Sequence, residues 1–158
     1  MHKSSKQFYV THKPLTAHQV LEKAAEILAC QFSRGEHINS PQVTKDYLAF
    51  KLAGNKREVF AMLLLDNQHR LIEYRELFYG TIDSASVHPR EIVRAVIEVN
   101  AACVILAHNH PSGDTEPSVS DKKITQRIVE ALGLIDVRVL DHIVLGNEAF
   151  SFAENNLL

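Results

Sequence analysis

Apolar residues recur along most of the chain, at helical spacing in some segments and as short unbroken runs in others. Thr16 and Gln19 form a capping-box pattern ahead of the first segment with helical spacing, and Gly35 is suited to end that helix. A second helix is predicted to start at Ser40, with Pro41 in the first-turn position that proline favours, and to end near Gly54. Two helices are therefore expected before any strand.

Strand patterns begin after the second predicted helix. Residues 59–66 form an almost unbroken apolar run, which favours a strand covered on both faces, with a buried helix as the main alternative. Residues 70–82 alternate more and predict one or two less buried strands, with a bend at Gly80. Three more strand-like segments follow, at 102–108, 137–145 and 149–152.

Two amphipathic helices are predicted between these later strands. One begins at Pro89 and ends near Asn100, with an expected inner face of Ile92, Val93, Val96 and Ile97. The other extends from Ser118 to about Leu132. Strands that alternate with amphipathic helices indicate an α/β or α+β sandwich, in which the end of a strand and the loop after it commonly hold the functional site.

Composition and charge narrow the classes of protein that fit this pattern. The 158 residues, 46% of them apolar, suffice for one compact domain. The net charge of -2 is far from the basic excess of nucleic-acid-binding proteins, so direct nucleic-acid binding is not expected. The sequence lacks both an apolar run of about 20 residues and a signal-peptide core, which predicts a cytoplasmic protein with no membrane partner.

The loop after the strand at 102–108 carries the residues best suited to chemistry. His108 and His110 are two residues apart, so in extended backbone their side chains leave one face roughly 6.6 Å apart. Asp121 lies three residues after Ser118 at a predicted helix start, and the short loop can return it toward the histidines. Catalytic zinc typically has three nitrogen or oxygen ligands from the protein and one water. His108, His110 and Asp121 are therefore predicted to bind one zinc ion per chain.

Other interpretations of these residues remain open. Ser118 can simply cap the helix with Asp121 as its acidic partner, although capping and metal binding can coexist. Asp114 and Glu116 lie in the same loop and can compete for the ion. His142 can support the site through a hydrogen bond, but a lone histidine in a strand is more often structural.

The segment HNHPSGDTEPSVSD resembles the JAMM, or MPN-plus, zinc metalloprotease motif. The segments EVFAMLLLD, FYGTIDSASVHPREIVR and LDHIVLG are similar to the bacterial RadC-like family. This resemblance covers residues 38–158 and leaves residues 1–37 as an N-terminal extension with one amphipathic helix. It implies a three-layer sandwich of the JAMM and cytidine-deaminase-like type, with a mixed central sheet between helices.

The resemblance also implies roles for two further residues. Glu58 stands where the family has a glutamate before the first long apolar strand, and it would act as the general base. From spacing alone, Glu58 is an ordinary surface residue in a charged stretch. Ser118 would stabilise the developing oxyanion. The expected activity is zinc-dependent hydrolysis of an amide bond by a peptidase or isopeptidase that acts on a peptide or protein.

Two other functions fit the sequence less well. A non-catalytic or DNA-repair-associated binding module on the same scaffold is the alternative, although the charge argues against direct DNA contact. A nucleobase deaminase would require H-x-E and P-C-x-x-C segments, which the sequence lacks. Asn109 replaces the small hydroxyl residue usual in the deubiquitinating branch of the JAMM superfamily, which weakens the inference of ubiquitin-like substrates.

Overall fold

A mixed β-sheet forms the centre of the protein in a computed structural model that describes residues 13–33, 41–52, 54–80 and 86–158. The elements follow in the order α1 (Ala17–Ser33), α2 (Pro41–Leu52), β1 (Val59–Leu65), β2 (Leu71–Tyr79), α3 (Pro89–Val99), β3 (Cys103–Asn109), α4 (Val119–Gly133), β4 (Arg138–Leu145) and β5 (Ala149–Ser151). Each predicted helix and strand in these ranges is present.

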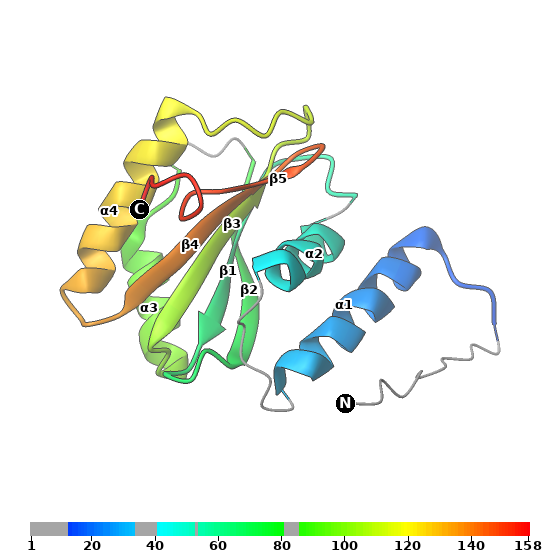
Figure 1. Ribbon diagram of the computed structural model, residues 1–158, viewed down its shortest axis with the longest axis horizontal. Helices are drawn as coiled ribbons and strands as arrows, with labels where there is room; N and C mark the ends of the chain where they lie inside the picture. Colours follow the sequence, from blue (N-terminus) through cyan, green and yellow to red (C-terminus); the bar gives the residue numbers. More distant parts are fainter. Residues whose placement is uncertain (1–12, 34–40, 53, 81–85) are drawn as a thin grey trace.

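The order of strands across the sheet is β2-β1-β3-β4-β5. β1 is antiparallel to both β2 and β3, β3 is parallel to β4, and β4 is antiparallel to β5. Figure 1 shows α3 and α4 on one face of the sheet and α2 on the other, with α1 outside α2. The predicted sandwich with a mixed central sheet is confirmed.

The sheet separates two hydrophobic cores, one under α3 and α4 and one under α2 and α1. Alternate residues of β1 enter the two cores: Phe60, Met62 and Leu64 on the α3–α4 side, and Ala61, Leu63 and Leu65 on the α2–α1 side. Every residue of β1 and β3 is buried, because helices cover both faces of these central strands. The strand interpretation of residues 59–65 is therefore confirmed over the helical alternative.

The predicted helix ends are largely confirmed. The backbone N–H of Gln19 donates to Oγ1 of Thr16 at 3.3 Å, and the Gln19 amide oxygen accepts from the Thr16 N–H at 2.9 Å, which is the expected capping box. Pro89 begins α3, and Asn100 ends it in the left-handed conformation. Gly54, with φ of +81°, follows α2, whereas Gly35 lies outside the described residues.

One predicted core position is wrong. Ile97 was expected on the inner face of α3, but its side chain is 63% exposed. The buried residues of this helix are Ile92, Ala95 and Val96. Their spacing of three and four residues makes a contact stripe narrower than the predicted one, and this stripe turns Ile97 toward solvent.

The helix α1 packs against α2 and shares its core. Ala25 is fully buried, and Lys51 of α2 forms a 3.0 Å ion pair with Glu22 of α1. None of the helices formed by described residues is long and apolar enough to cross a membrane.

Candidate metal centre

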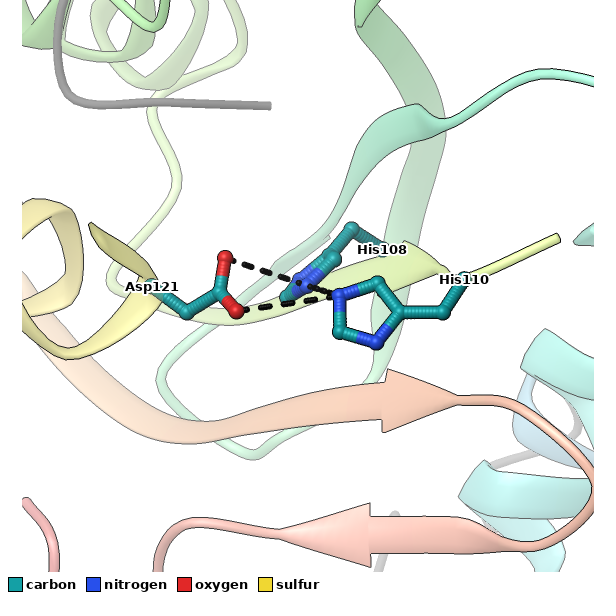
Figure 2. A group of neighbouring side chains, drawn as sticks. All are labelled: His108, His110 and Asp121. Carbon is teal, nitrogen blue, oxygen red and sulfur yellow. Dashed lines mark hydrogen bonds and ion pairs between the residues drawn. The ribbon is translucent and has the colours of Figure 1, made fainter. Parts of the chain in front are cut away.

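Three side chains from two elements and a loop meet at the end of β3 that is nearest the start of α4. His108 is fully buried on the α3–α4 face of β3, His110 follows the strand, and Asp121 lies in the first turn of α4. Nε2 of His108 is 3.0 Å from Nε2 of His110 and 3.3 Å from Oδ1 of Asp121. Nε2 of His110 is 3.7 Å from Oδ2 of Asp121. Figure 2 shows the carboxylate facing both imidazole rings.

These separations fit a small metal ion. One ligand atom from each residue can be chosen so that all three lie within 4.8 Å of one another. A tetrahedral ion with bonds of about 2.0 to 2.1 Å places its ligand atoms roughly 3.3 Å apart, close to the observed 3.0 to 3.7 Å. His108, His110 and Asp121 could therefore hold a metal ion.

Asp121 is held in place by the cap of α4. The Asp121 N–H donates to Oγ of Ser118 at 3.0 Å, and the Ser118 N–H donates to Oδ2 of Asp121 at 2.7 Å. This is a reciprocal capping box, so the capping interpretation of these two residues is confirmed. The cap does not compete with the metal centre, because the same hydrogen bond orients the carboxylate toward the histidines.

The charge state of Asp121 also suits this environment. Burial raises the pKa of Asp121, but the neighbouring His108 and Ser118 lower it. The lowering contributions prevail, so the pKa of Asp121 lies well below its usual range. Asp121 is therefore a carboxylate at neutral pH.

The loop after His110 is pinned against the turn between β4 and β5. The His110 N–H donates to the Leu145 carbonyl at 2.7 Å, and the Asn147 N–H donates to the Gly113 carbonyl at 2.8 Å. A Cβ at Gly146 would lie 2.5 Å from the Gly113 carbonyl oxygen, so this close approach requires glycine. The pinned loop places the Asp114 carbonyl 2.9 Å from Nδ1 of His110.

His142, whose role the sequence left open, and Thr125, which no sequence pattern singled out, lie next to His108 and Asp121. His142 is fully buried, with Nε2 at 2.8 Å from Nδ1 of His108 and Nδ1 at 2.6 Å from Oγ1 of Thr125. Burial lowers the pKa of His142 well below its usual range, and the neighbouring His108 and His110 add to this decrease, although Asp121 opposes it. His142 is therefore a neutral imidazole beside the site.

Glu58 lies at the same end of the sheet, immediately before β1. Phe60 pairs with His108 across the antiparallel β1–β3 ladder, so continuing this register by two residues places Glu58 opposite His110. The two-residue alternation of β1 also puts position 58 on the same face as Phe60, which is the α3–α4 face. Glu58 is half-buried, and its carbonyl accepts a hydrogen bond from the Gly80 N–H at 2.9 Å.

Asn109, the residue between the two histidines, holds the chain on both sides of Glu58. Its Oδ1 accepts from the Val59 N–H at 2.8 Å, and its Nδ2 donates to the Arg57 carbonyl at 3.2 Å. The amide is buried, so each of these hydrogen bonds matters for the local backbone. The structure thus gives Asn109 a positioning role that the sequence pattern did not suggest.

Asp114 and Glu116, the possible competitors for the ion, belong to a different arrangement. Both side chains are exposed, and the Asp114 carboxylate accepts from the Glu116 N–H at 3.0 Å. Among the described residues, the group suited to a metal ion contains neither of them. Asp114 contributes through its backbone carbonyl, which accepts the His110 hydrogen bond.

The sequence model of the RadC-like JAB domain matches residues 38–157. The chain belongs to this family. A UPF0758 protein from Vibrio cholerae is 60% identical to this RadC-like JAB chain, over 89% of this chain and 89% of its own length. A second UPF0758 protein from Vibrio cholerae is 55% identical, over 95% of this chain and 95% of its own length. A UPF0758 protein from Aeromonas hydrophila is 60% identical over 88% of this chain and 62% of its own length. The resemblance inferred from the motif is confirmed, and the JAB match spans the entire metal centre.

Proposed function

We propose that this RadC-like JAB domain is a zinc-dependent metallohydrolase that cleaves an amide bond in a peptide or protein, as a metallopeptidase or isopeptidase. The main support is the buried group of His108, His110 and Asp121, whose ligand atoms have tetrahedral spacing. Two imidazole nitrogens and one carboxylate oxygen form a donor set that zinc accepts, and three protein ligands leave a fourth position for water or substrate. When bound, zinc would lower the pKa of a water and polarise the scissile carbonyl.

Glu58 is proposed to move the proton in this reaction. Its register opposite His110 and its face of the sheet bring it to the rim of the metal centre. A carboxylate there can accept a proton from the attacking water and deliver it to the nitrogen of the leaving amine. The clamp by Asn109 on the neighbouring backbone would keep Glu58 in position for both transfers.

Ser118 is proposed to stabilise charge on the carbonyl oxygen of the substrate. Its oxygen accepts the cap hydrogen bond from the Asp121 N–H, which leaves the hydroxyl proton able to donate. Ser118 is exposed, so a substrate can reach it. A donor aimed at the developing oxyanion stabilises the transition state more than the ground state.

Space for a substrate lies beside His110. A cavity of about 460 Å³ separates α2 from the turn between β4 and β5, and His110 and Asn109 contribute to one side of it. Polar side chains of Gln42, Asp46 and Asn147 also line it. His110 is the metal-centre residue in this lining, so the cavity would hold a part of the substrate next to the scissile bond, on the α2 side of the sheet.

The proposal is tested with zinc-loaded protein and a library of fluorescence-quenched peptides that includes isopeptide-linked members. Wild-type protein should cleave members of the library, and a chelator should abolish the cleavage. Glu58→Gln should keep its zinc, because Glu58 is not a ligand, but should slow cleavage by about a hundredfold or more.

The matched control is Glu130→Gln, which makes the same chemical change at an exposed residue of α4. This variant should cleave at the wild-type rate. Wild-type turnover by fully zinc-loaded Glu58→Gln would remove Glu58 from the mechanism. Loss of zinc from Glu58→Gln would instead indicate a ligand role. A zinc-loaded wild type that cleaves no member of the library would contradict amide hydrolysis.

A further inference from the structure

A line of buried hydrogen bonds leads from the metal centre to α4. Nδ1 of His108 contacts Nε2 of His142, and Nδ1 of His142 contacts Oγ1 of Thr125 at 2.6 Å. The Thr125 hydroxyl also lies 2.6 Å from the backbone carbonyl of Asp121, one helical turn earlier. All three side chains are buried, and each contact between two polar atoms at this distance requires one proton.

The chemistry of the end groups assigns these protons. A carbonyl oxygen can only accept, so the Thr125 hydroxyl donates its proton to Asp121. The Thr125 oxygen must then accept from His142, so Nδ1 of His142 carries a proton, and the fully buried ring between Phe60 and Phe152 favours an uncharged imidazole with this single proton. Nε2 of His142 is left as an acceptor, and His108 must donate to it from Nδ1.

This assignment determines which nitrogen of His108 can bind a metal ion. With its proton on Nδ1, a neutral His108 has its lone pair on Nε2, the atom that faces Asp121 and His110. His110 has the same tautomer, with its proton on Nδ1, because its Nδ1 donates directly to the Asp114 carbonyl. Both Nε2 atoms lie beside the Asp121 carboxylate, and a metal ion bound by the three side chains would take the place of a proton between these atoms.

We propose that His142 and Thr125 are positioning residues that hold His108 in the tautomer whose Nε2 binds the metal ion. This inference rests on the metal centre of the proposed function. The ring of His142 is well placed for this role, because it stacks on Phe152 at a centroid distance of 4.7 Å and forms a T-shaped pair with Phe60 at a centroid distance of 5.6 Å. The aromatic packing fixes the ring plane, and the hydrogen bonds then fix its proton.

The proposal makes Thr125 matter to a metal ion that it does not contact. Replacing Thr125 with valine keeps the shape but removes the oxygen that accepts from His142. The proton of His142 is then free to occupy Nε2, where it opposes the Nδ1 proton of His108. His108 can relieve this conflict only by moving its own proton to Nε2, the atom that the metal ion needs.

The test measures zinc affinity by competition with a chromophoric chelator, together with thermal unfolding of the metal-free proteins. Thr125→Val and His142→Leu should weaken zinc binding by about tenfold or more, as loss of hydrogen bonds behind a ligand commonly does. Thr125→Ser restores the hydroxyl, and His142→Gln can place an amide oxygen near the Nε2 position. Both conservative variants should bind zinc within about threefold of wild type.

If His142 and Thr125 had a purely structural role, the variants would unfold at lower temperature, but the conservative and the disruptive variants would have similar zinc affinities. Wild-type affinity in folded Thr125→Val would therefore overturn the proposal, as would equal weakening in Thr125→Val and Thr125→Ser. If His142→Leu fails to fold, the Thr125 pair decides. Failure of the wild type to bind zinc would refute the metal centre itself, a result distinct from loss of the difference between variants.

Nuclear magnetic resonance gives a second readout that needs no substrate. Long-range nitrogen–proton spectra of the zinc-loaded protein should show His142 protonated on Nδ1, and Thr125→Val should shift population toward Nε2. A wild-type His142 protonated on Nε2 would contradict the assigned direction of the hydrogen bonds.

Discussion

At the residue scale, Ser118 and Asp121 serve the helix and the candidate metal centre through the same atoms. Oδ2 of Asp121 accepts the cap hydrogen bond from the Ser118 N–H and also lies 3.7 Å from Nε2 of His110. The two interpretations of S-x-x-D that the sequence left open are therefore compatible. A helix cap is a rigid support for a carboxylate, because it fixes the orientation of the side chain through the backbone.

Ser118→Ala should separate these effects. Loss of the cap should lower the free energy of unfolding by about 1 kcal/mol, and loss of the hydroxyl donor should slow amide cleavage by roughly a hundredfold. Denaturant unfolding and peptide cleavage by the zinc-loaded protein measure the two quantities.

Thr16→Ala is the control for Ser118→Ala, because it breaks the corresponding capping box of α1, far from the site in the fold. It should destabilise the protein by up to about 1 kcal/mol and leave cleavage unchanged. Cleavage by Ser118→Ala at the wild-type rate would show that the residue is a cap alone.

At the element scale, the end of β3 organises the start of β1. Asn109 is the last residue of β3, and its amide joins this strand to the backbone on either side of Glu58. The antiparallel strands β1 and β3 thus bring the candidate base and the histidines to one end of the central strands, although about fifty residues separate them in the sequence. The loop after β3 is fixed in turn by the close approach of Gly146.

Asn109→Asp should disturb the candidate base without removing a metal ligand. The carboxylate still accepts from the Val59 N–H, but its second oxygen faces the Arg57 carbonyl and repels it. We expect unchanged zinc affinity, a loss of about 1 to 3 kcal/mol in the free energy of unfolding, and cleavage slowed roughly tenfold or more.

The same three measurements on Asn67→Asp provide the comparison for Asn109→Asp. Asn67 is exposed in the turn between β1 and β2, so the identical chemical change should have no comparable effect there. Wild-type cleavage by Asn109→Asp would show that the clamp does not position Glu58.

At the scale of the whole molecule, charge bears on which partners the protein accepts. The 17 basic and 19 acidic residues leave a net charge of -2. Proteins that neutralise several phosphates lose DNA affinity steeply with salt, because binding releases counterions. We expect no such behaviour from this chain.

A fluorescence-anisotropy titration with a labelled DNA duplex tests this expectation. Affinity should be weak at about 50 mM salt and should change little at about 200 mM, whereas several phosphate contacts would lower it by roughly a thousandfold or more. Tight, steeply salt-dependent binding would favour the DNA-associated alternative over a protein substrate. Zinc-loaded and chelator-treated protein should give the same curve.

Local sequence patterns are enough to predict the helices and strands and the residues closest to the candidate metal ion. Local rules govern both: the period of apolar residues distinguishes β1 from α3, and the H-x-H and S-x-x-D spacings act within one strand end and one helix turn. The exposure of Ile97 was not predicted by these local patterns, because the width of the buried stripe on α3 depends on how the helix packs on the sheet.

The support of the site by residues distant in the sequence follows from the folded structure. His142, Thr125 and Asn109 act through hydrogen bonds between β4, α4, β3 and the start of β1, and no spacing in the sequence encodes such contacts. A hydrogen bond depends on the distance and direction between two groups in space. The order of the strands and the packing of the helices on the sheet fix both. Sequence therefore gave the candidate ligands, whereas the folded chain supplied the residues that orient them.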